Sequence, residues 1–176
     1  MKCPKCKTED LKPTKLEQGL SAMGCGQCHG ALVSLLYYRD WAERQEPVMP
    51  AGEVSAEQAT DSEAAMTCPK CSRLMTKFRI SGCNNHRLDL CASCDEAWLD
   101  GGEWELLKTL ELSRLMPLVF TEEWQRKLRR ERFAADREAR LRKVVNEADV
   151  EQAKSMRSWL KGHPHRAEIL FFVNHE

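Results

Sequence analysis

The chain has 176 residues, which is the length of one ordinary domain or of two or three small modules. Its 27 basic and 27 acidic side chains balance, and no apolar run approaches the roughly 18 residues of a membrane-spanning helix. The start, Met1-Lys2-Cys3-Pro4, lacks the apolar stretch of an export signal. We therefore expect a cytoplasmic protein with no membrane partner, in which nine cysteines indicate metal thiolates rather than disulfides.

Eight of the nine cysteines form four C-x-x-C pairs, which fall into two sets of matching span. The pairs are separated by 18 residues in the first set and by 19 in the second, and each set begins with Cys-Pro-Lys-Cys. A C-x-x-C turn brings two sulfurs close enough to share one tetrahedral ion, with Zn–S bonds of about 2.3 Å. The repeat therefore predicts two Zn²⁺ ions, one held by Cys3, Cys6, Cys25 and Cys28 and the other by Cys68, Cys71, Cys91 and Cys94.

Composition divides the chain into four segments. Residues 1–45 are interpreted as a first zinc ribbon, a small β-hairpin that needs a metal because so short a chain buries too little apolar surface. Residues 46–66 hold two prolines, one glycine and five acidic residues, and are interpreted as an acidic flexible linker. Residues 67–116 are interpreted as a second zinc ribbon with a capping helix, and residues 117–176 as a charged helical region. We call residues 1–45 the first copy and residues 67–116 the second copy.

The second copy has the pattern of a hairpin followed by a helix. A strand is expected over 74–80, a turn over 81–85 and a return strand over 86–90. A helix is expected to begin after Asp100, with Asp100 and Glu103 forming a capping box, and to run to about Met116. Trp98 and Trp104 are expected in the core.

The last segment is expected to be helical throughout. Thr121 is a candidate cap for a helix that runs to about Val145, and a further helix over 147–160 is ended by Gly162. The tail over 163–176 fits a helix or a short strand, and helical spacing is preferred. The predicted fold class is thus a small, metal-stabilised α+β protein with two zinc ribbons and a helical C-terminal region.

From Cys68 onward the sequence resembles a known family. A Cys-Pro knuckle, a hairpin, the string Leu88-Asp89-Leu90-Cys91, Cys94 and the string Ala97-Trp98-Leu99-Asp100-Gly101-Gly102-Glu103 are similar to the bacterial zinc-ribbon family named after the ribbon of transcription factor IIB. Residues 3–40 look like a degenerate copy of the same pattern. The resemblance implies a zinc ribbon and little about activity. One departure is that Asp95 and Glu96 follow the last cysteine, where small residues are usual.

The cysteine quartets argue against catalysis. Four thiolates close the coordination sphere of a metal, so no position remains for an activated water, and no candidate nucleophile, base or phosphate loop stands elsewhere. Cys25-Gly-Gln-Cys28-His29 also spells a haem-attachment string, but that would take two sulfurs from the first quartet. Cys83, the odd cysteine, is interpreted as a small thiol in a turn, and with His86 it forms an alternative C-x-x-H ligand pair.

Basic residues gather in one helical stretch, 126–143, which holds nine of them against three acidic residues. Three interpretations stay open for it: a solvated helix with i,i+4 pairs such as Glu138–Arg142, a helix that contacts a partner or a second copy of the chain, and a phosphate-contacting surface. The candidate contact residues are Arg126, Lys127, Arg129, Arg130, Arg132, Arg137, Arg140, Arg142 and Lys143.

The sequence therefore favours a non-enzymatic zinc-binding adaptor that contacts a protein partner, associated with transcription or translation machinery by analogy with other ribbons. The first alternative is direct DNA or RNA binding through residues 126–143, helped by Lys2, Lys5, Lys7, Lys12 and Lys15. The second is a thiol-based redox or zinc sensor that uses Cys83. Oligomeric state, partner identity and the role of the first copy stay open.

Overall fold

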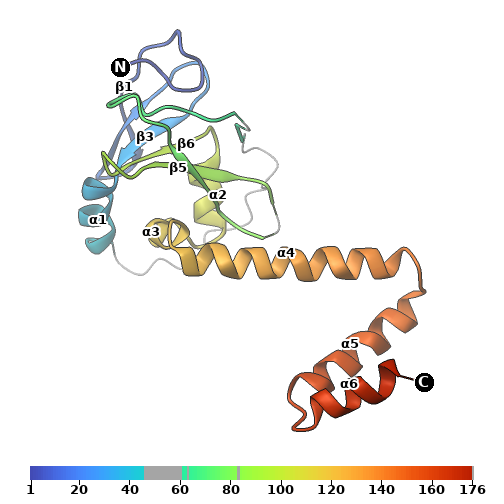
Figure 1. Ribbon diagram of the computed structural model, residues 1–176. Coiled ribbons are helices and arrows are strands. Elements are labelled where there is room, and N and C mark those ends of the chain that lie inside the picture. The colour runs from blue at the N-terminus through green and yellow to red at the C-terminus, as the bar shows by residue number, and fades with distance from the viewer. Residues whose placement is uncertain (46–60, 63, 83, 176) are drawn as a thin grey trace. The chain divides into compact units, whose positions relative to one another are not determined.

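The computed structural model describes residues 1–45, 61–62, 64–82 and 84–175 (Figure 1). It shows a mixed α+β protein with an antiparallel six-stranded sheet, which confirms the α+β class. The chain forms two compact units, Met1–Arg129 and Arg130–Glu176. Cys83 and residues 46–60 lie outside the described residues, so the interpretations of the acidic linker over that range and of the odd cysteine stay predictions.

The two copies share the sheet of the first unit. The first copy contributes β1 (Lys12–Glu17), β2 (Leu20–Gly24) and β3 (Ala31–Ser34), and the second contributes β4 (Thr76–Arg79), β5 (Arg87–Cys91) and β6 (Glu96–Leu99). The strand order is β1-β2-β3-β6-β5-β4, so β3 and β6 join the copies at the middle of the sheet. This pairing of the copies was not anticipated from the sequence.

The register between β3 and β6 relates the copies by a pseudo-two-fold axis. Leu32 lies opposite Trp98, and these two residues occupy the same position in their copies, counted from Cys28 and Cys94. On either side, Ala31 lies opposite Leu99, and Val33 lies opposite Ala97. Ala31 and Ala97 occupy the same position in their copies, as do Val33 and Leu99, so the two cross-strand pairs are exchanged by the axis. An antiparallel pair of equivalent strands has this symmetry, and the axis passes through the Leu32–Trp98 pair.

The middle strands of the sheet carry buried side chains on both faces. One face carries Leu20, Val33, Leu88 and Leu99 and packs against α1 (Leu35–Glu43), α2 (Glu103–Thr109) and α3 (Met116–Val119). The other face carries Leu32, Trp98 and cysteines of both quartets. The expectation that Trp98 and Trp104 are core residues is confirmed, since both are at least 95% buried.

The helix after the second copy is shorter than expected. It ends at Thr109 and not near Met116, because Glu111 takes a left-handed conformation with φ of 57°. The Leu112 N–H then donates to the Leu107 carbonyl, and the Glu111 N–H donates to the Lys108 carbonyl. These two hydrogen bonds define a Schellman motif at the end of the helix. This turn buries Leu112 in the core.

The expected capping box is half right. The Asp100 N–H does donate to Glu103 Oε2 at 2.8 Å. The residue at the N-cap, however, is Gly102 with φ of 85°, and the Asp100 carboxylate turns away from the helix to accept from Trp98 Nε1 and from the Ser62 N–H.

The C-terminal helices follow the expectations closely. α4 (Glu122–Arg142) is capped by Thr121, whose hydroxyl accepts from the Trp124 N–H. α5 (Glu147–Lys161) is capped at its N-terminus by Asn146 and is followed by Gly162, and the tail forms α6 (Arg166–Asn174). In the described part of the second unit, Val150 is the one buried apolar side chain. None of the helices described is both long enough and apolar enough to cross a membrane.

Candidate metal centres

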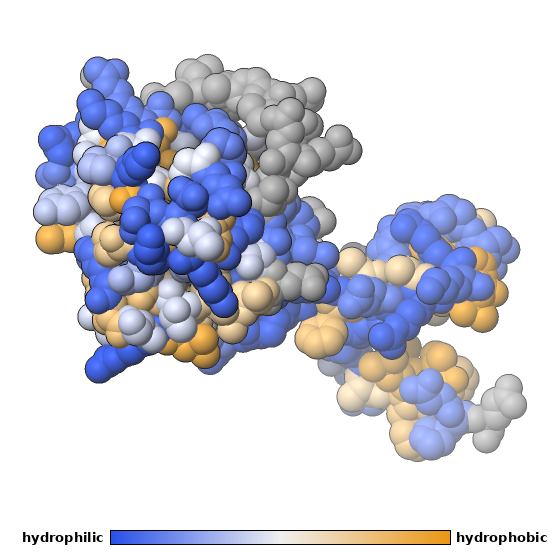
Figure 2. Space-filling view, turned by 90° about the horizontal axis from the view of Figure 1, so that it is seen from above, coloured by the Kyte–Doolittle hydropathy of each residue, from blue (hydrophilic) through white to orange (hydrophobic). Residues whose placement is uncertain are grey.

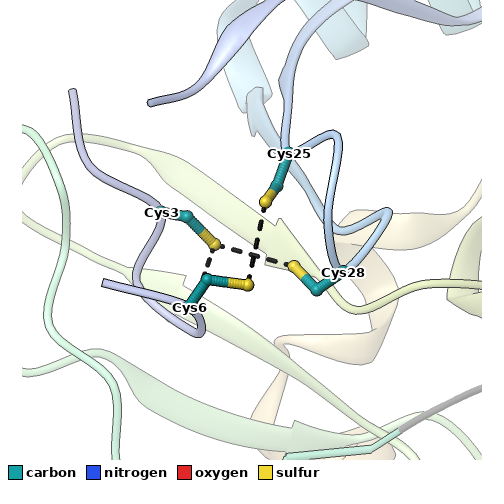
Figure 3. Close-up of side chains that lie close together, drawn as sticks. All are labelled: Cys3, Cys6, Cys25 and Cys28. Atoms are coloured by element: carbon teal, nitrogen blue, oxygen red, sulfur yellow. Dashed lines mark hydrogen bonds between the residues drawn. The ribbon is translucent and has the colours of Figure 1, made fainter. Parts of the chain in front are cut away.

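The four cysteines of the first copy converge on one point (Figure 3). Cys3 and Cys6 lie in the turn before β1, and Cys25 and Cys28 lie in the turn between β2 and β3. Cys3 Sγ lies 3.6 Å from Cys28 Sγ, and Cys25 Sγ lies 3.8 Å from Cys6 Sγ. Because Cys25 and Cys28 both face the other pair, the haem-attachment interpretation would break up an assembled quartet. This group of thiols could hold a metal ion.

The second copy repeats the arrangement. Cys68, Cys71, Cys91 and Cys94 form a second group whose sulfurs lie within 4.8 Å of one another, with Cys71 Sγ 3.5 Å from Cys91 Sγ. The eight described cysteines are all free thiols, so neither quartet contains a disulfide. Each group could hold one ion, and both groups contain the residues that the C-x-x-C spacing singles out.

The four knuckles share one backbone conformation. The residue after the second cysteine of each C-x-x-C pair is left-handed: Lys7, His29, Ser72 and Asp95, with φ between 55° and 64°. In three knuckles the N–H of that residue donates to the carbonyl of the first cysteine, and in the fourth the Cys94 N–H donates to the Cys91 carbonyl. The backbone therefore folds each pair of sulfurs inward before any ion is considered.

The departure at Asp95 is accommodated by this geometry. Asparagine and aspartate are among the side chains that tolerate the left-handed region best. The Asp95 carbonyl accepts from the Leu35 N–H, and its carboxylate pairs with Arg39 at 2.9 Å. Both partners belong to the first copy, so this knuckle also ties the copies together.

The pKa values of the thiols are spread apart within each quartet. Burial alone raises the pKa of Cys25, but the backbone N–H groups of Cys28 and Gln27 outweigh it and bring the pKa to about 7. The Arg73 N–H and the Cys94 thiol likewise lower the pKa of Cys71 to about 7. The side-chain hydrogen bond with Cys71 is the largest cause that raises the pKa of Cys94 to about 12, and desolvation is the next largest. Among these thiols, Cys25 and Cys71 form thiolates most readily, and the thiolate is the form that ligates a metal.

A cluster of buried carboxylates lies beside these centres and was missed by the sequence analysis. Asp61, Asp100 and Glu103 each place an oxygen within 4.8 Å of the other two. Asp61 comes from the segment interpreted as a flexible linker, yet it pairs with Arg87 at 2.9 Å. Met66, at the end of the same segment, is buried in the core on the cysteine side of the sheet. The segment from Asp61 onward is therefore packed where the structure describes it.

Burial raises the pKa of two carboxyl groups in this region. Desolvation, reinforced by the charges of Asp100, Asp61 and Asp89, raises the pKa of Glu103 to about 9, against the lowering effect of the Asp100 N–H. Desolvation also raises the pKa of Asp89 to about 6, although Lys77 opposes it. The sequence signal that could have identified the cluster is the pair of acidic residues Asp100 and Glu103 close to Trp98. We interpreted this pair only as a helix cap.

The candidate contact residues lie on α4, except for Lys143 just beyond its end, and they divide into paired and unpaired groups. Arg126 and Arg129 pair with Glu122, and Arg142 pairs with Glu138 and Glu147, which confirms the expected Glu138–Arg142 pair. Lys127 lies over the ring of Trp124 at 5.1 Å. Among the described residues, no ion pair involves Arg130, Arg132, Arg140 or Lys143. Arg137 lines a pocket of about 280 Å³ between α4 and α5.

Two of the lysines considered for nucleic-acid contact are occupied elsewhere. Lys2 pairs with Asp10 at 2.9 Å, and Lys5 pairs with Asp100 at 3.1 Å. The Asp100 side chain is buried, so Lys5 points into the protein rather than toward a ligand in solvent.

Comparison of the chain with protein-family models, with curated proteins and with solved structures found no match in any of the three.

Proposed function

We propose that each cysteine quartet binds one structural Zn²⁺ ion and that the two copies are zinc ribbons of the kind found in transcription factor IIB. The observation that carries this proposal is the spacing of the sulfurs, at 3.5 to 3.8 Å for three pairs. A regular tetrahedron with Zn–S bonds of about 2.3 Å has an edge of about 3.8 Å. The sulfurs thus stand where the ligands of a tetrahedral ion belong.

Native mass spectrometry of the purified full chain tests this assignment. Two zinc ions per molecule are expected, with one lost in Cys28→Ser and the other lost in Cys94→Ser. A chain that binds fewer than two ions, or that loses both on either substitution, contradicts two independent centres. Elemental analysis of the same samples separates zinc from iron.

The protein acts, in this proposal, as a non-enzymatic adaptor that contacts a protein partner through its second unit. A tetrahedral ion with four thiolates has no open position for a water or a substrate, so the metal serves the fold. The second unit exposes large apolar side chains on α5 and α6, and Figure 2 shows such residues at its surface. They are Met156, Trp159, Phe171, Phe172 and Val173, each about half exposed or more.

The described part of the second unit combines these exposed apolar side chains with a very small core. A segment of 47 residues in which Val150 is the one described apolar side chain to be buried gains little from folding alone. Contact with a partner would remove the aromatic rings from water and stabilise the helices. Tryptophan and other aromatic residues are also enriched among the side chains that dominate binding energies.

Affinity capture with the zinc-loaded chain tests the adaptor function. Trp159→Ala and Phe172→Ala should each remove a specific bound protein, while Tyr37→Ala, which changes an exposed aromatic residue on α1, should retain it. Equal capture by all four proteins would exclude the second unit as the docking surface.

Direct nucleic-acid binding is a second candidate, favoured by the unpaired basic residues of α4. Arg130, Arg132 and Arg140 project from one exposed helix and are available to contact phosphates. Binding should then weaken steeply between about 50 and 200 mM salt and in a triple alanine variant at these positions. Arg126→Ala provides the control, because that side chain is paired with Glu122. Affinity that is flat with salt would exclude this candidate.

A further inference from the structure

The carboxyl groups buried between the copies outnumber the basic side chains that pair with them. Each aspartate of the region has one cationic partner: Lys5 for Asp100 at 3.1 Å, Lys77 for Asp89 at 2.8 Å and Arg87 for Asp61 at 2.9 Å. No described basic side chain pairs with Glu103, although its side chain is fully buried. The excess carboxylate of the region is therefore Glu103.

One oxygen of Glu103 has nothing to bond. Oε2 accepts from the Asp100 N–H, whereas Oε1 is buried and has no hydrogen-bond partner among the described residues. Leaving a carboxylate oxygen buried and unpaired is costly, and such an atom in a native fold points to an occupant that the protein atoms do not supply. The Glu103 carboxylate faces Asp61 and Asp100, with one oxygen of each residue within 4.8 Å of the others.

The separations of the three oxygens, none above 4.8 Å, do not exceed the span of a hard divalent cation of the size of Ca²⁺. Mg²⁺ with bonds of about 2.1 Å and Ca²⁺ with bonds of about 2.4 Å place opposite ligands at most about 4.2 and 4.8 Å apart. Carboxylate oxygens are the ligands that both ions prefer, and zinc in this protein has thiolates available instead. The ligands come from different parts of the chain, Asp61 before the second copy and Asp100 and Glu103 at the end of β6 and the start of α2.

We propose that Asp61, Asp100 and Glu103 form a third metal site, for Mg²⁺ or Ca²⁺, distinct from the two cysteine quartets. The cation binds Glu103 Oε1 and joins the segment before the second copy to the start of α2. Lys5 reaches Asp100 from the first Cys-Pro-Lys-Cys knuckle, so the site lies where both copies meet. This proposal is independent of the adaptor function and of the identity of the ion in the quartets.

Terbium luminescence provides a direct probe of this site. Tb³⁺ occupies oxygen-ligand sites of the Ca²⁺ type, does not favour thiolates, and emits when a nearby tryptophan is excited. Trp98 donates from Nε1 to Asp100 Oδ1 at 3.1 Å, so the sensitiser touches a proposed ligand. The experiment titrates Tb³⁺ into the zinc-loaded full chain, and then adds Ca²⁺ or Mg²⁺ in excess.

Glu103→Gln and Glu105→Gln form a matched pair of variants. Glutamine at 103 keeps an oxygen that can accept from the Asp100 N–H, and it removes the negative charge. Glu105 lies two residues along α2 with a half-exposed side chain and outside the cluster. Saturable emission displaced by Ca²⁺ or Mg²⁺ is expected in the unaltered chain and in Glu105→Gln, with affinity at least about tenfold lower in Glu103→Gln.

Two results would overturn the proposal. One is the absence of saturable emission from the folded, zinc-loaded chain, and the other is equal affinity in Glu103→Gln and Glu105→Gln. Either would mean that a proton, and not a metal ion, occupies Glu103. Should Glu103→Gln lose its zinc or its fold, Asp61→Asn tests the same site from its more exposed end and must weaken Tb³⁺ binding by a similar factor.

Discussion

Gly30 of the first copy lies directly against the ring of Trp98 in the second copy. A Cβ atom added there would lie 2.3 Å from Trp98 Cζ2 and 3.0 Å from Cε2 and Cη2 of the same ring. Trp98 is fully buried, and its Nε1 donates to Asp100 Oδ1. The indole ring therefore has no free space to move into, and it loses a hydrogen bond to a carboxylate if it shifts.

The cost of Gly30→Ala follows from these distances. Carbon atoms pack at about 3.5 to 4.0 Å, so the ring or the strand must move by more than about 1 Å. Overpacking of this kind costs about 1–3 kcal/mol, and a weakened hydrogen bond to a charged group adds about 1.5–3 kcal/mol. We expect Gly30→Ala to lower the free energy of unfolding by about 3–5 kcal/mol.

Urea unfolding of the zinc-loaded protein measures this change. Gly26→Ala is the matched control, because it adds the same methyl group in the same copy, where nothing lies within 4 Å of the new Cβ. Its effect should stay within about 0.5 kcal/mol. Trp98→Phe should cost less in the Gly30→Ala background than alone, since the smaller ring leaves room for the methyl group. A Gly30→Ala protein as stable as Gly26→Ala would refute the close packing of Trp98 on the first copy.

Three further predictions concern charge, metal and backbone. In buffer without added divalent cations, Glu103 with its pKa of about 9 keeps a proton in the folded state and loses it in the unfolded state between about pH 5 and 9. Unfolding free energy should therefore fall by about 1.4 kcal/mol per pH unit as pH rises in this window, relative to Glu103→Gln, and parallel pH profiles would contradict the raised pKa. Removal of metal by a strong chelator should abolish the fixed near-ultraviolet signal of Trp98, because cysteines of both quartets form part of its core; an unchanged signal would show that the thiols hold that core without an ion. Asp95→Gly should stabilise the zinc-loaded protein by about 0.5–1 kcal/mol relative to Asp95→Ala, measured by thermal unfolding, because φ of 55° strains alanine and not glycine; equal stabilities would argue against the left-handed knuckle.

The sequence predicted the quartets because their chemistry is local. A C-x-x-C turn brings its own two sulfurs together, and the matching spans of the two sets identify which pairs belong to each other. The C-terminal helices were predictable for a similar reason, since Thr121 and Gly162 are ordinary start and stop residues. Signals that act within a few residues can be read without knowledge of the fold.

The features that were missed depend on distant partners or on unusual residues. The end of α2 was missed because Glu111, and not glycine, takes the left-handed position, and the reason for that turn is the burial of Leu112. The pairing of β3 with β6 depends on two strands of four residues each, too short to reveal a partner. The carboxylate cluster needs Asp61 to meet Glu103, and no pattern in the sequence relates these residues.

The structure gives a different meaning to the divergence between the copies. In the first copy, which we interpreted as degenerate, Leu32 stands where the second copy has Trp98, and Ser34 where it has Asp100. These two positions face each other on the pseudo-two-fold axis, so an exact duplication would set two indole rings against one another. With leucine on one side, the ring of Trp98 lies against Gly30, a position where the second copy has Glu96. Leu32 and Gly30 therefore complement Trp98, and the replacement of tryptophan by Leu32, which makes the first copy look degenerate, lets it pair with the second.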